Sequence, residues 1–220
     1  MIKAVVFDMD GVLFDTEYLN SLAWKQIANE DKMENIEEIL KECIGRSCED
    51  TRVVFRNAYG ENFGFDEFRE KSRVIFQGHI EKNWLPIKQG AKELLEYLKK
   101  EGFKIGLASS TKQESVHGHL KSSGFDEYFE FIIGGDMVNE SKPHPEIYEL
   151  ACKGLGIQPQ EAYCIEDSFN GVRSASLAGL KVIMVPDLLE PTEEIKVLLY
   201  KECKTLLEVK EHLEEIKDLQ

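Results

Sequence analysis

Two aspartates separated by one residue, Asp8 and Asp10, are the strongest candidates for chemistry in this chain of 220 residues. They directly follow residues 4–7, an apolar and β-branched run short enough to be a buried strand. Residues i and i+2 of an extended segment point the same way, so both carboxylates would face one small space. Such a pair repels itself unless a cation is present or one carboxyl group holds a proton. The pair predicts a cation or acid–base site; the alternative is solvated acids in a strand-end turn.

The remaining pattern changes once along the chain, near Pro86. Residues 16–86 carry helical stripes of apolar residues and no convincing strand, with one stripe at Leu19, Ala23 and Ile27 and further predicted helices over 33–43, 49–58 and 65–84. Beyond Pro86, predicted strands alternate with predicted helices. The strands are 103–108, 131–133, 162–165 and 181–185, and the helices are 90–100, 112–121, 145–155, 169–178 and 206–219.

Alternation of this kind implies a parallel sheet covered on both faces by helices. We therefore predict an α/β fold, a doubly wound parallel sheet of the Rossmann type, with an inserted all-helical domain. The core domain would comprise residues 1–15 and 87–220, and the helical insert residues 16–86.

Composition narrows the classes of partner. The chain has a formal net charge of −14, which argues against binding to nucleic acid or to an anionic membrane, because both require basic patches. No apolar run approaches membrane-spanning length, and Met1 leads straight into the first strand. Its five cysteines show neither Cys-x-x-Cys nor Cys/His ligand spacing, so we interpret them as reduced residues of a cytoplasmic protein.

Ligands of open α/β sheets bind beyond the carboxyl ends of the strands. In this chain those positions hold Asp8 and Asp10, then Ser109, then a loop that reaches Lys142, then Glu166 and Asp167. Hard oxygen ligands, a nucleophile, a proton carrier and one positive charge are the components of phosphoryl transfer assisted by Mg²⁺.

Each role follows from a physical requirement. Asp8 is expected to be ionised at neutral pH without help and to attack phosphorus, forming an aspartyl-phosphate. Asp8, the Asp10 backbone carbonyl and Asp167 are predicted Mg²⁺ ligands, with Glu166 completing or orienting that shell. Asp10 is the predicted general acid and base.

Ser109, at a helix N-terminus, would bind a phosphoryl oxygen, and Lys142 would supply positive charge. Taken singly, these residues have simpler interpretations. Ser109 is also a plausible helix N-cap, Lys142 a solvated loop lysine, and Glu166 with Asp167 the cap of the next helix. The positions after successive strands favour the chemical interpretation.

Four motifs together resemble those of the haloacid dehalogenase (HAD) superfamily, in the subgroup with a helical cap after the first strand. They are Asp8-Met-Asp10-Gly-Val, Ala108-Ser109-Ser, Ser141-Lys142-Pro143-x-Pro145 and Glu166-Asp167-Ser168-x-x-Gly171. The resemblance covers essentially the whole chain, and it implies the roles given above.

Within the superfamily, an aspartate at the position of Asp10 implies phosphomonoester chemistry. The nearest resemblance is to β-phosphoglucomutases and related sugar-phosphate phosphatases. It implies substrate-binding roles for five residues: Thr16, Asn20, Arg46, Ser110 and Lys112. Two of these depart from the mutase pattern, because mutases have histidine at the position of Asn20 and two basic residues where this chain has only Arg46.

The sequence thus predicts a Mg²⁺-dependent phosphatase that acts on a small phosphorylated metabolite such as a sugar phosphate. The alternative is a β-phosphoglucomutase, which would need a second anion site in the cap. A non-catalytic phospho-aspartate switch is the third interpretation. Switches of this kind are the receiver domains of response regulators. These domains carry the acceptor aspartate after a later strand and have no helical insert, so the sequence disfavours a switch.

Overall fold

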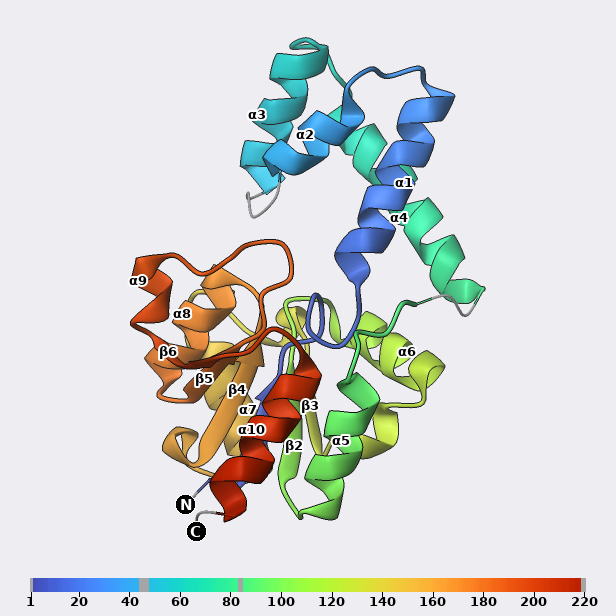
Figure 1. The fold of residues 1–220 in the computed structure, drawn as a ribbon. Helices are drawn as coiled ribbons and strands as arrows, with labels where there is room; N and C mark the ends of the chain where they lie inside the picture. The colour runs from blue at the N-terminus through green and yellow to red at the C-terminus, as the bar shows by residue number, and fades with distance from the viewer. Residues whose placement is uncertain (1, 44–47, 83–84, 219–220) are drawn as a thin grey trace. The chain divides into compact units, whose positions relative to one another are not determined.

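The computed structural model describes residues 2–43, 48–82 and 85–218 and divides the chain into two compact units (Figure 1). The core unit comprises residues 1–15 and 87–220, and the helical unit comprises residues 16–86. Each unit has a hydrophobic cluster of its own. Among the described residues, no helix is long and apolar enough to cross a membrane.

The core unit is built on a six-stranded sheet with the strand order β3-β2-β1-β4-β5-β6, in which every pair of neighbours is parallel. The strands are β1 (Ala4–Phe7), β2 (Lys104–Ala108), β3 (Phe131–Ile133), β4 (Ala162–Glu166), β5 (Lys181–Met184) and β6 (Leu199–Glu202). The prediction of a doubly wound parallel sheet is confirmed. Strand order reverses between β1 and β4, the point where this architecture places its ligand crevice.

Helices cover both faces of this sheet. They are α5 (Ala91–Lys100), α6 (Gln113–Ser123), α7 (Glu146–Leu155), α8 (Phe169–Ala178), α9 (Glu193–Lys196) and α10 (Leu206–Asp218), with short 3₁₀ helices at Asp126–Tyr128, Gly135–Met137 and Pro159–Glu161. Helices α5 and α10 lie side by side on one face, and α7 and α8 pack together on the other (Figure 1). The buried cluster between the sheet and α7–α8 includes Val6, Cys164 and Tyr148.

Strand β6 and helix α9 are absent from the sequence prediction. Strand β6 reads Leu-Tyr-Lys-Glu, and three of its four residues are exposed. Among the described strands, β6 pairs only with β5, so its position beside β5 rather than an apolar run makes it a strand. Helix α9 spans a single turn around the buried Ile195 and is too short to show a helical period.

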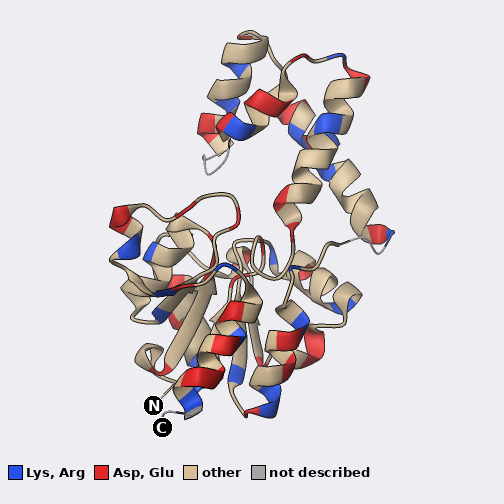
Figure 2. Cartoon of the chain, viewed as in Figure 1, with Lys and Arg blue, Asp and Glu red and all other residues tan. Residues whose placement is uncertain are grey.

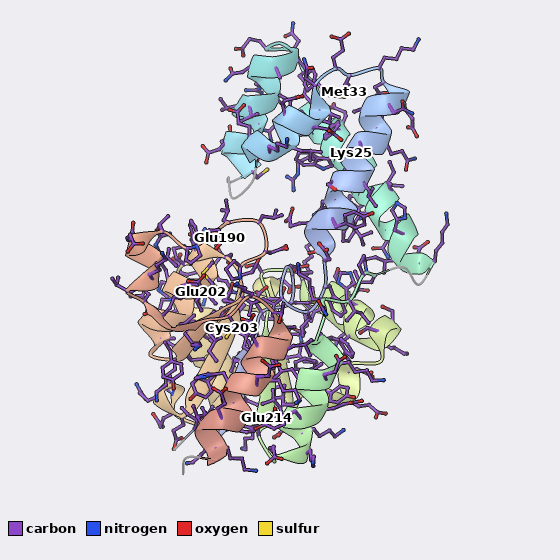
Figure 3. All side chains as sticks on the ribbon, in the orientation of Figure 1. Lys25, Met33, Glu190, Glu202, Cys203 and Glu214 are labelled. Carbon is purple, nitrogen blue, oxygen red and sulfur yellow. The ribbon has the colours of Figure 1, made fainter. Side chains whose placement is uncertain are left out.

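The helical unit consists, in its described residues, of α1 (Thr16–Glu30), α2 (Ile36–Cys43), α3 (Cys48–Tyr59) and α4 (Phe65–Glu81). Its centre is aromatic: Phe55 packs against Phe68 with ring centroids 4.9 Å apart and meets Trp24 edge-on at 5.2 Å. Met33, labelled in Figure 3, packs against the same cluster. Burial of large aromatic surfaces is therefore the main stabilising contribution in this unit.

Charged side chains of both signs are spread over the helices of both units (Figure 2). In the described part of the helical unit, no Asp, Glu, Lys or Arg is buried. In the core unit, by contrast, Asp8 and Glu166 are buried, and the Lys142 side chain is only 6% exposed. Buried charged groups require close partners of opposite charge. The cluster of Asp8, Lys142 and Glu166 is therefore the candidate site for chemistry.

Candidate active site

The turn after β1 places Asp8 at the strand-order reversal. The Asp8 N–H donates to the carbonyl of Ile165 at 2.9 Å, which extends the pairing of β1 with β4 by one residue. The chain then reverses at Gly11, which has φ of 81°. A Cβ atom at Gly11 would lie 2.2 Å from Oδ2 of Asp167. Glycine is thus required both by the backbone conformation and by the approach of Asp167.

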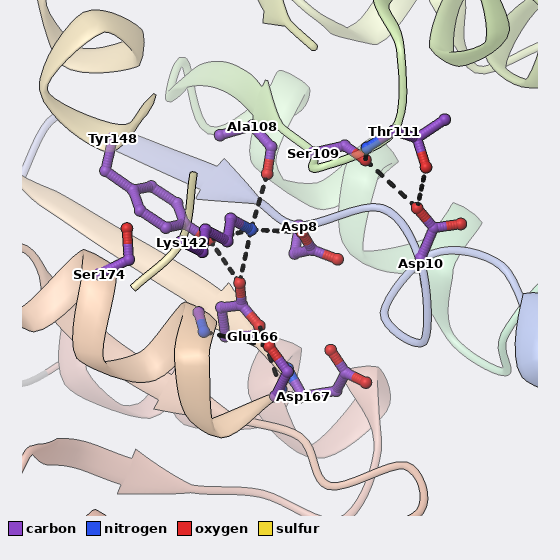
Figure 4. Close-up of polar contacts among 12 residues, drawn as sticks. Asp8, Asp10, Ala108, Ser109, Thr111, Lys142, Tyr148, Glu166, Asp167 and Ser174 are labelled. Carbon is purple, nitrogen blue, oxygen red and sulfur yellow. Dashed lines mark hydrogen bonds and ion pairs between the residues drawn. The ribbon is translucent and has the colours of Figure 1, made fainter. Parts of the chain in front are cut away.

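Lys142 is the centre of the buried network (Figure 4). Its Nζ donates to Oδ1 of Asp8 at 2.5 Å and to Oε1 of Glu166 at 2.7 Å. The Ala108 carbonyl and the Tyr148 hydroxyl each accept from it at 3.1 Å. The interpretation of Lys142 as a solvated loop lysine is therefore wrong.

Glu166 has both carboxylate oxygens occupied by donors. Oε1 accepts from Lys142 and, at 2.7 Å, from the Tyr148 hydroxyl. Oε2 accepts from the backbone N–H groups of Asp167 and Ser168, each at 3.1 Å, and from the Ser168 hydroxyl at 3.0 Å. A carboxylate has about four lone-pair directions, so these five donors saturate it. A Cβ at Gly171 would lie 1.7 Å from Oε1, so this packing also requires glycine.

Charge in this network is unbalanced. Burial raises the pKa of Asp8 to about 8, opposed by the charge of Lys142 and reinforced by Glu166 and Asp10. Burial and the charges of Glu166 and Asp8 raise the pKa of Asp167 well above its usual value. In the absence of a cation Asp8 therefore favours the protonated form at neutral pH, contrary to the expectation that it is ionised without help, because one ammonium group stands beside two buried carboxylates and the half-buried Asp167.

The pKa values of the other two members shift toward the charged forms. Burial on its own raises the pKa of Glu166, but Lys142 and the hydrogen bonds to the carboxylate hold it below its usual value. Burial likewise lowers the pKa of Lys142, but Asp8 and Glu166 beside it more than offset this effect. Lys142 and Glu166 thus form an ion pair, and Asp8 accepts a hydrogen bond from the ammonium group of that pair.

Asp10 binds a different set of partners from Asp8. Its Oδ2 accepts from the Ser109 hydroxyl at 3.2 Å and from the Thr111 hydroxyl at 2.7 Å (Figure 4). The expectation that both carboxylates face one space holds only in part. Asp8 binds Lys142, whereas Asp10 is turned toward the loop after β2.

Ser109 does not begin a helix. Helix α6 starts at Gln113 with Lys112 as its N-cap residue, and the Gln113 N–H donates to Oδ1 of Asp136 at 2.7 Å. The Ser109 hydroxyl instead accepts from the Thr111 N–H at 3.0 Å. Neither the predicted helix N-terminus nor the N-cap alternative describes Ser109, because three loop residues separate it from α6.

A cation fits this site. Asp8, Glu166 and Asp167 each have a carboxylate oxygen, and these atoms lie within 4.8 Å of one another. Because Glu166 already accepts from five donors, Asp8 and Asp167 are the candidate ligands, and Glu166 adds negative charge beside them. The donor set is all oxygen, which suits a hard divalent cation such as Mg²⁺. A divalent charge would also compensate the carboxylates that raise the pKa values of Asp8 and Asp167.

None of the hydrogen bonds described above for Lys142, Glu166 and Asp10 is made by a predicted substrate-binding residue. Thr16 is buried at the start of α1 and Asn20 is half-buried one turn later. Ser110 and Lys112 are exposed in the loop after β2. Arg46 lies outside the described residues. Their roles remain predictions.

Two residues of the network were not identified from the sequence. Tyr148, which contacts both Lys142 and Glu166, lies in an apolar helix where it looks like an ordinary core residue. Thr111 lies outside the four motifs, in the loop between β2 and α6. Its spacing of two from Ser109 is the one local signal, because alternate residues of an extended segment point the same way.

Several known proteins are similar to this chain in sequence and in fold. The family model for haloacid dehalogenase-like hydrolases matches residues 5–185. YhcW of Bacillus subtilis is 36% identical over 193 residues, covering 85% of this chain and 84% of that protein. The phosphorylated carbohydrates phosphatase of Thermotoga maritima is 33% identical over 186 residues, covering 82% and 83%. The crystal structure of β-phosphoglucomutase from Clostridium difficile is 26% identical, covers 98% and 96%, and superposes with a TM-score of 0.73.

Proposed function

The chain belongs to the haloacid dehalogenase-like hydrolase family, and on that basis we propose that it is a Mg²⁺-dependent phosphatase for a small phosphomonoester such as a sugar phosphate. The observation that carries this proposal is the contact of 2.5 Å between Lys142 and the buried Asp8 at the carboxyl end of β1. It aligns a nucleophile with a fixed positive charge. The relative from Thermotoga maritima, named for phosphorylated carbohydrates, supports the substrate class.

In the first half-reaction, a carboxylate oxygen of Asp8 attacks phosphorus and the bond from phosphorus to the leaving oxygen breaks. Asp10 donates its proton to that oxygen, and the phosphoryl group remains on Asp8 as an acyl phosphate. In the second half-reaction, water attacks phosphorus while Asp10 accepts a proton from the water, the bond between phosphorus and the Asp8 oxygen breaks, and inorganic phosphate leaves with the Asp8 carboxylate restored. Lys142 stabilises the charge on the phosphoryl oxygens throughout.

Asp8, the Asp10 carbonyl and Asp167 would hold the Mg²⁺. The ion supplies positive charge that offsets the repulsion between a carboxylate nucleophile and an anionic phosphate. Glu166, whose lone pairs are already occupied, is proposed to orient Lys142 and the Asp167 backbone and to act on the metal through its charge.

The test is release of inorganic phosphate from a panel of sugar phosphates and other small phosphomonoesters, with MgCl₂ or with excess EDTA. We expect turnover with Mg²⁺, loss with EDTA, and a phosphoryl group on the peptide that contains Asp8 after acid quenching. Absence of phosphate release from every ester at saturating Mg²⁺ would refute the proposal.

The second candidate is a β-phosphoglucomutase, favoured by the structural similarity to that enzyme from Clostridium difficile. The two reactions differ in whether water or a sugar hydroxyl accepts the phosphoryl group from Asp8. Supplying β-glucose 1-phosphate with a trace of the bisphosphate separates them. Isomerisation faster than phosphate release would establish the mutase instead.

A further inference from the structure

Among the described residues, the hydrogen bonds to the Asp10 carboxylate all reach one oxygen. Oδ2 accepts from the hydroxyls of Ser109 and Thr111, and the Thr111 contact is the shorter, at 2.7 Å against 3.2 Å (Figure 4). We propose that Thr111 is a positioning residue that keeps Asp10 oriented for proton transfer while substrate is bound. This inference rests on the proposed function, in which Asp10 is the general acid.

Ser109 cannot perform this task in the loaded enzyme. A serine hydroxyl has one proton to donate. In the free protein that proton is directed at Asp10, and in the proposed reaction it turns to a phosphoryl oxygen of the substrate. Of the two hydroxyls that hold Asp10, the Thr111 hydroxyl alone then remains.

The loop that carries Thr111 is packed against the loop after β3. The Thr111 carbonyl accepts from the Gly135 N–H at 2.9 Å. A Cβ at Gly135 would lie 2.2 Å from the Ser110 carbonyl oxygen, and one at Gly134 would lie 2.3 Å from the Gln113 nitrogen. Backbone therefore lies directly on backbone here, which leaves the loop little freedom to move.

Gln113 joins the same two loops through its side chain. Its Nε2 donates to the Ile132 carbonyl at 3.1 Å, and its Oε1 accepts from the Gly134 N–H at 2.5 Å. The Thr111 backbone is thus held at both ends, because its N–H donates to the Ser109 hydroxyl and its carbonyl accepts from the Gly135 N–H. A hydroxyl fixed in this way keeps its direction when the Ser109 proton is withdrawn, which is the requirement for a positioning residue.

The contact also determines which oxygen carries the proton. Because Oδ2 receives hydroxyl donors, the transferred proton is placed on Oδ1. During bond breaking, the Oδ1–H bond is lost and a new O–H bond forms on the leaving oxygen. In the second half-reaction a water O–H bond breaks and its proton returns to Oδ1. Without the Thr111 hydroxyl, the carboxyl group is free to rotate and to present either oxygen.

The experiment compares Thr111→Val, which keeps the shape and removes the hydroxyl, with Thr111→Ser, which keeps the hydroxyl. The kcat/KM of each is measured on a sugar or alkyl phosphate, whose leaving oxygen needs a proton, and on 4-nitrophenyl phosphate, whose leaving group needs little assistance. Since general acid catalysis contributes 10²–10⁴-fold, we expect Thr111→Val to lose about 10- to 100-fold on the alkyl ester.

On 4-nitrophenyl phosphate the same variant should stay within about threefold of the parent, and Thr111→Ser within about threefold on both esters. Equal losses on both esters, or no loss on either, would overturn the positioning role. Thr111→Ala serves as a second hydroxyl-free variant if Thr111→Val fails to fold, as judged by its thermal transition.

Failure of this inference is distinguishable from failure of the proposed function. If the parent protein releases no phosphate from either ester, the proposed function is wrong. If Asp10→Asn shows the leaving-group dependence and Thr111→Val does not, the acid assignment stands and the inference about Thr111 is overturned.

Discussion

The two units of this chain use charged residues in opposite ways. In the core unit, Asp8, Lys142 and Glu166 are withdrawn from water and connected by short hydrogen bonds. In the helical unit, no described charge is buried, the pair of Arg73 with Glu70 is exposed, and the interior is aromatic. The core unit thus holds buried charges in fixed positions at a cost in stability, whereas the helical unit is stabilised by apolar packing.

Removing the nucleophile is expected to have the largest effect and to act on one side of this comparison. Asp8→Asn should abolish phosphate release while the protein stays folded, because an amide cannot attack phosphorus and the buried repulsion decreases. Asp66→Asn, which removes a carboxylate from the helical unit, is the matched control and should retain activity. Phosphate release and circular dichroism are the measurements. Residual activity of Asp8→Asn within about tenfold of the parent would contradict the role.

An aromatic truncation tests the other side. Phe55→Ala should lower the free energy of unfolding by about 3–5 kcal/mol, because it removes a fully buried ring that packs against five aromatic rings of the described residues. Urea denaturation followed by tryptophan fluorescence measures it. Hydrolysis of 4-nitrophenyl phosphate by the folded variant should stay within about tenfold of the parent. A larger loss would mean that the units do not divide stability and chemistry as inferred.

Lys142→Met is expected to cost about 2–4 kcal/mol of transition-state stabilisation, by analogy with the loss of one oxyanion donor. That corresponds to a decrease of about 30- to 1,000-fold in kcat. Lys88→Met is a suitable control, because Lys88 forms a part-buried ion pair with Asp187 in the same unit. If both variants lost the same activity, Lys142 would be contributing only a buried ion pair.

The smallest expected effect is a pH dependence of metal affinity. The pKa of Asp8 is about 8 without a cation, so below that pH the carboxyl group holds a proton that Mg²⁺ must displace. Affinity should therefore fall by at least about tenfold for each pH unit below 8, because the pKa of Asp167 is raised as well and its carboxyl group adds to the loss. Isothermal titration calorimetry at pH 6, 7 and 8 measures this, with Asp8→Asn showing a shallower dependence. A flat profile would show that Asp8 is already ionised in the free protein.

Much of the core unit could be predicted because its strands are apolar and its motif residues follow them. No local sequence pattern predicts the order of the strands in the sheet. Strand β6 was not predicted because its residues are mostly exposed. Similarly, the candidate residues Asp8, Asp10, Ser109 and Lys142 were predicted from their residue types and from their positions after predicted strands. Only the tertiary structure shows that Asp10 accepts from Thr111 and not from the partners of Asp8.

By itself, the amino-acid sequence determined which residues stand at the ends of strands, and hence the donor types that meet at one edge of the sheet. Only the tertiary structure decided their charge states and partners. Lys142 and Asp8 are 134 positions apart, and Thr111 and Asp10 are 101 apart. Desolvation and Coulomb interactions depend on distances in space, and no periodicity along the chain encodes those distances.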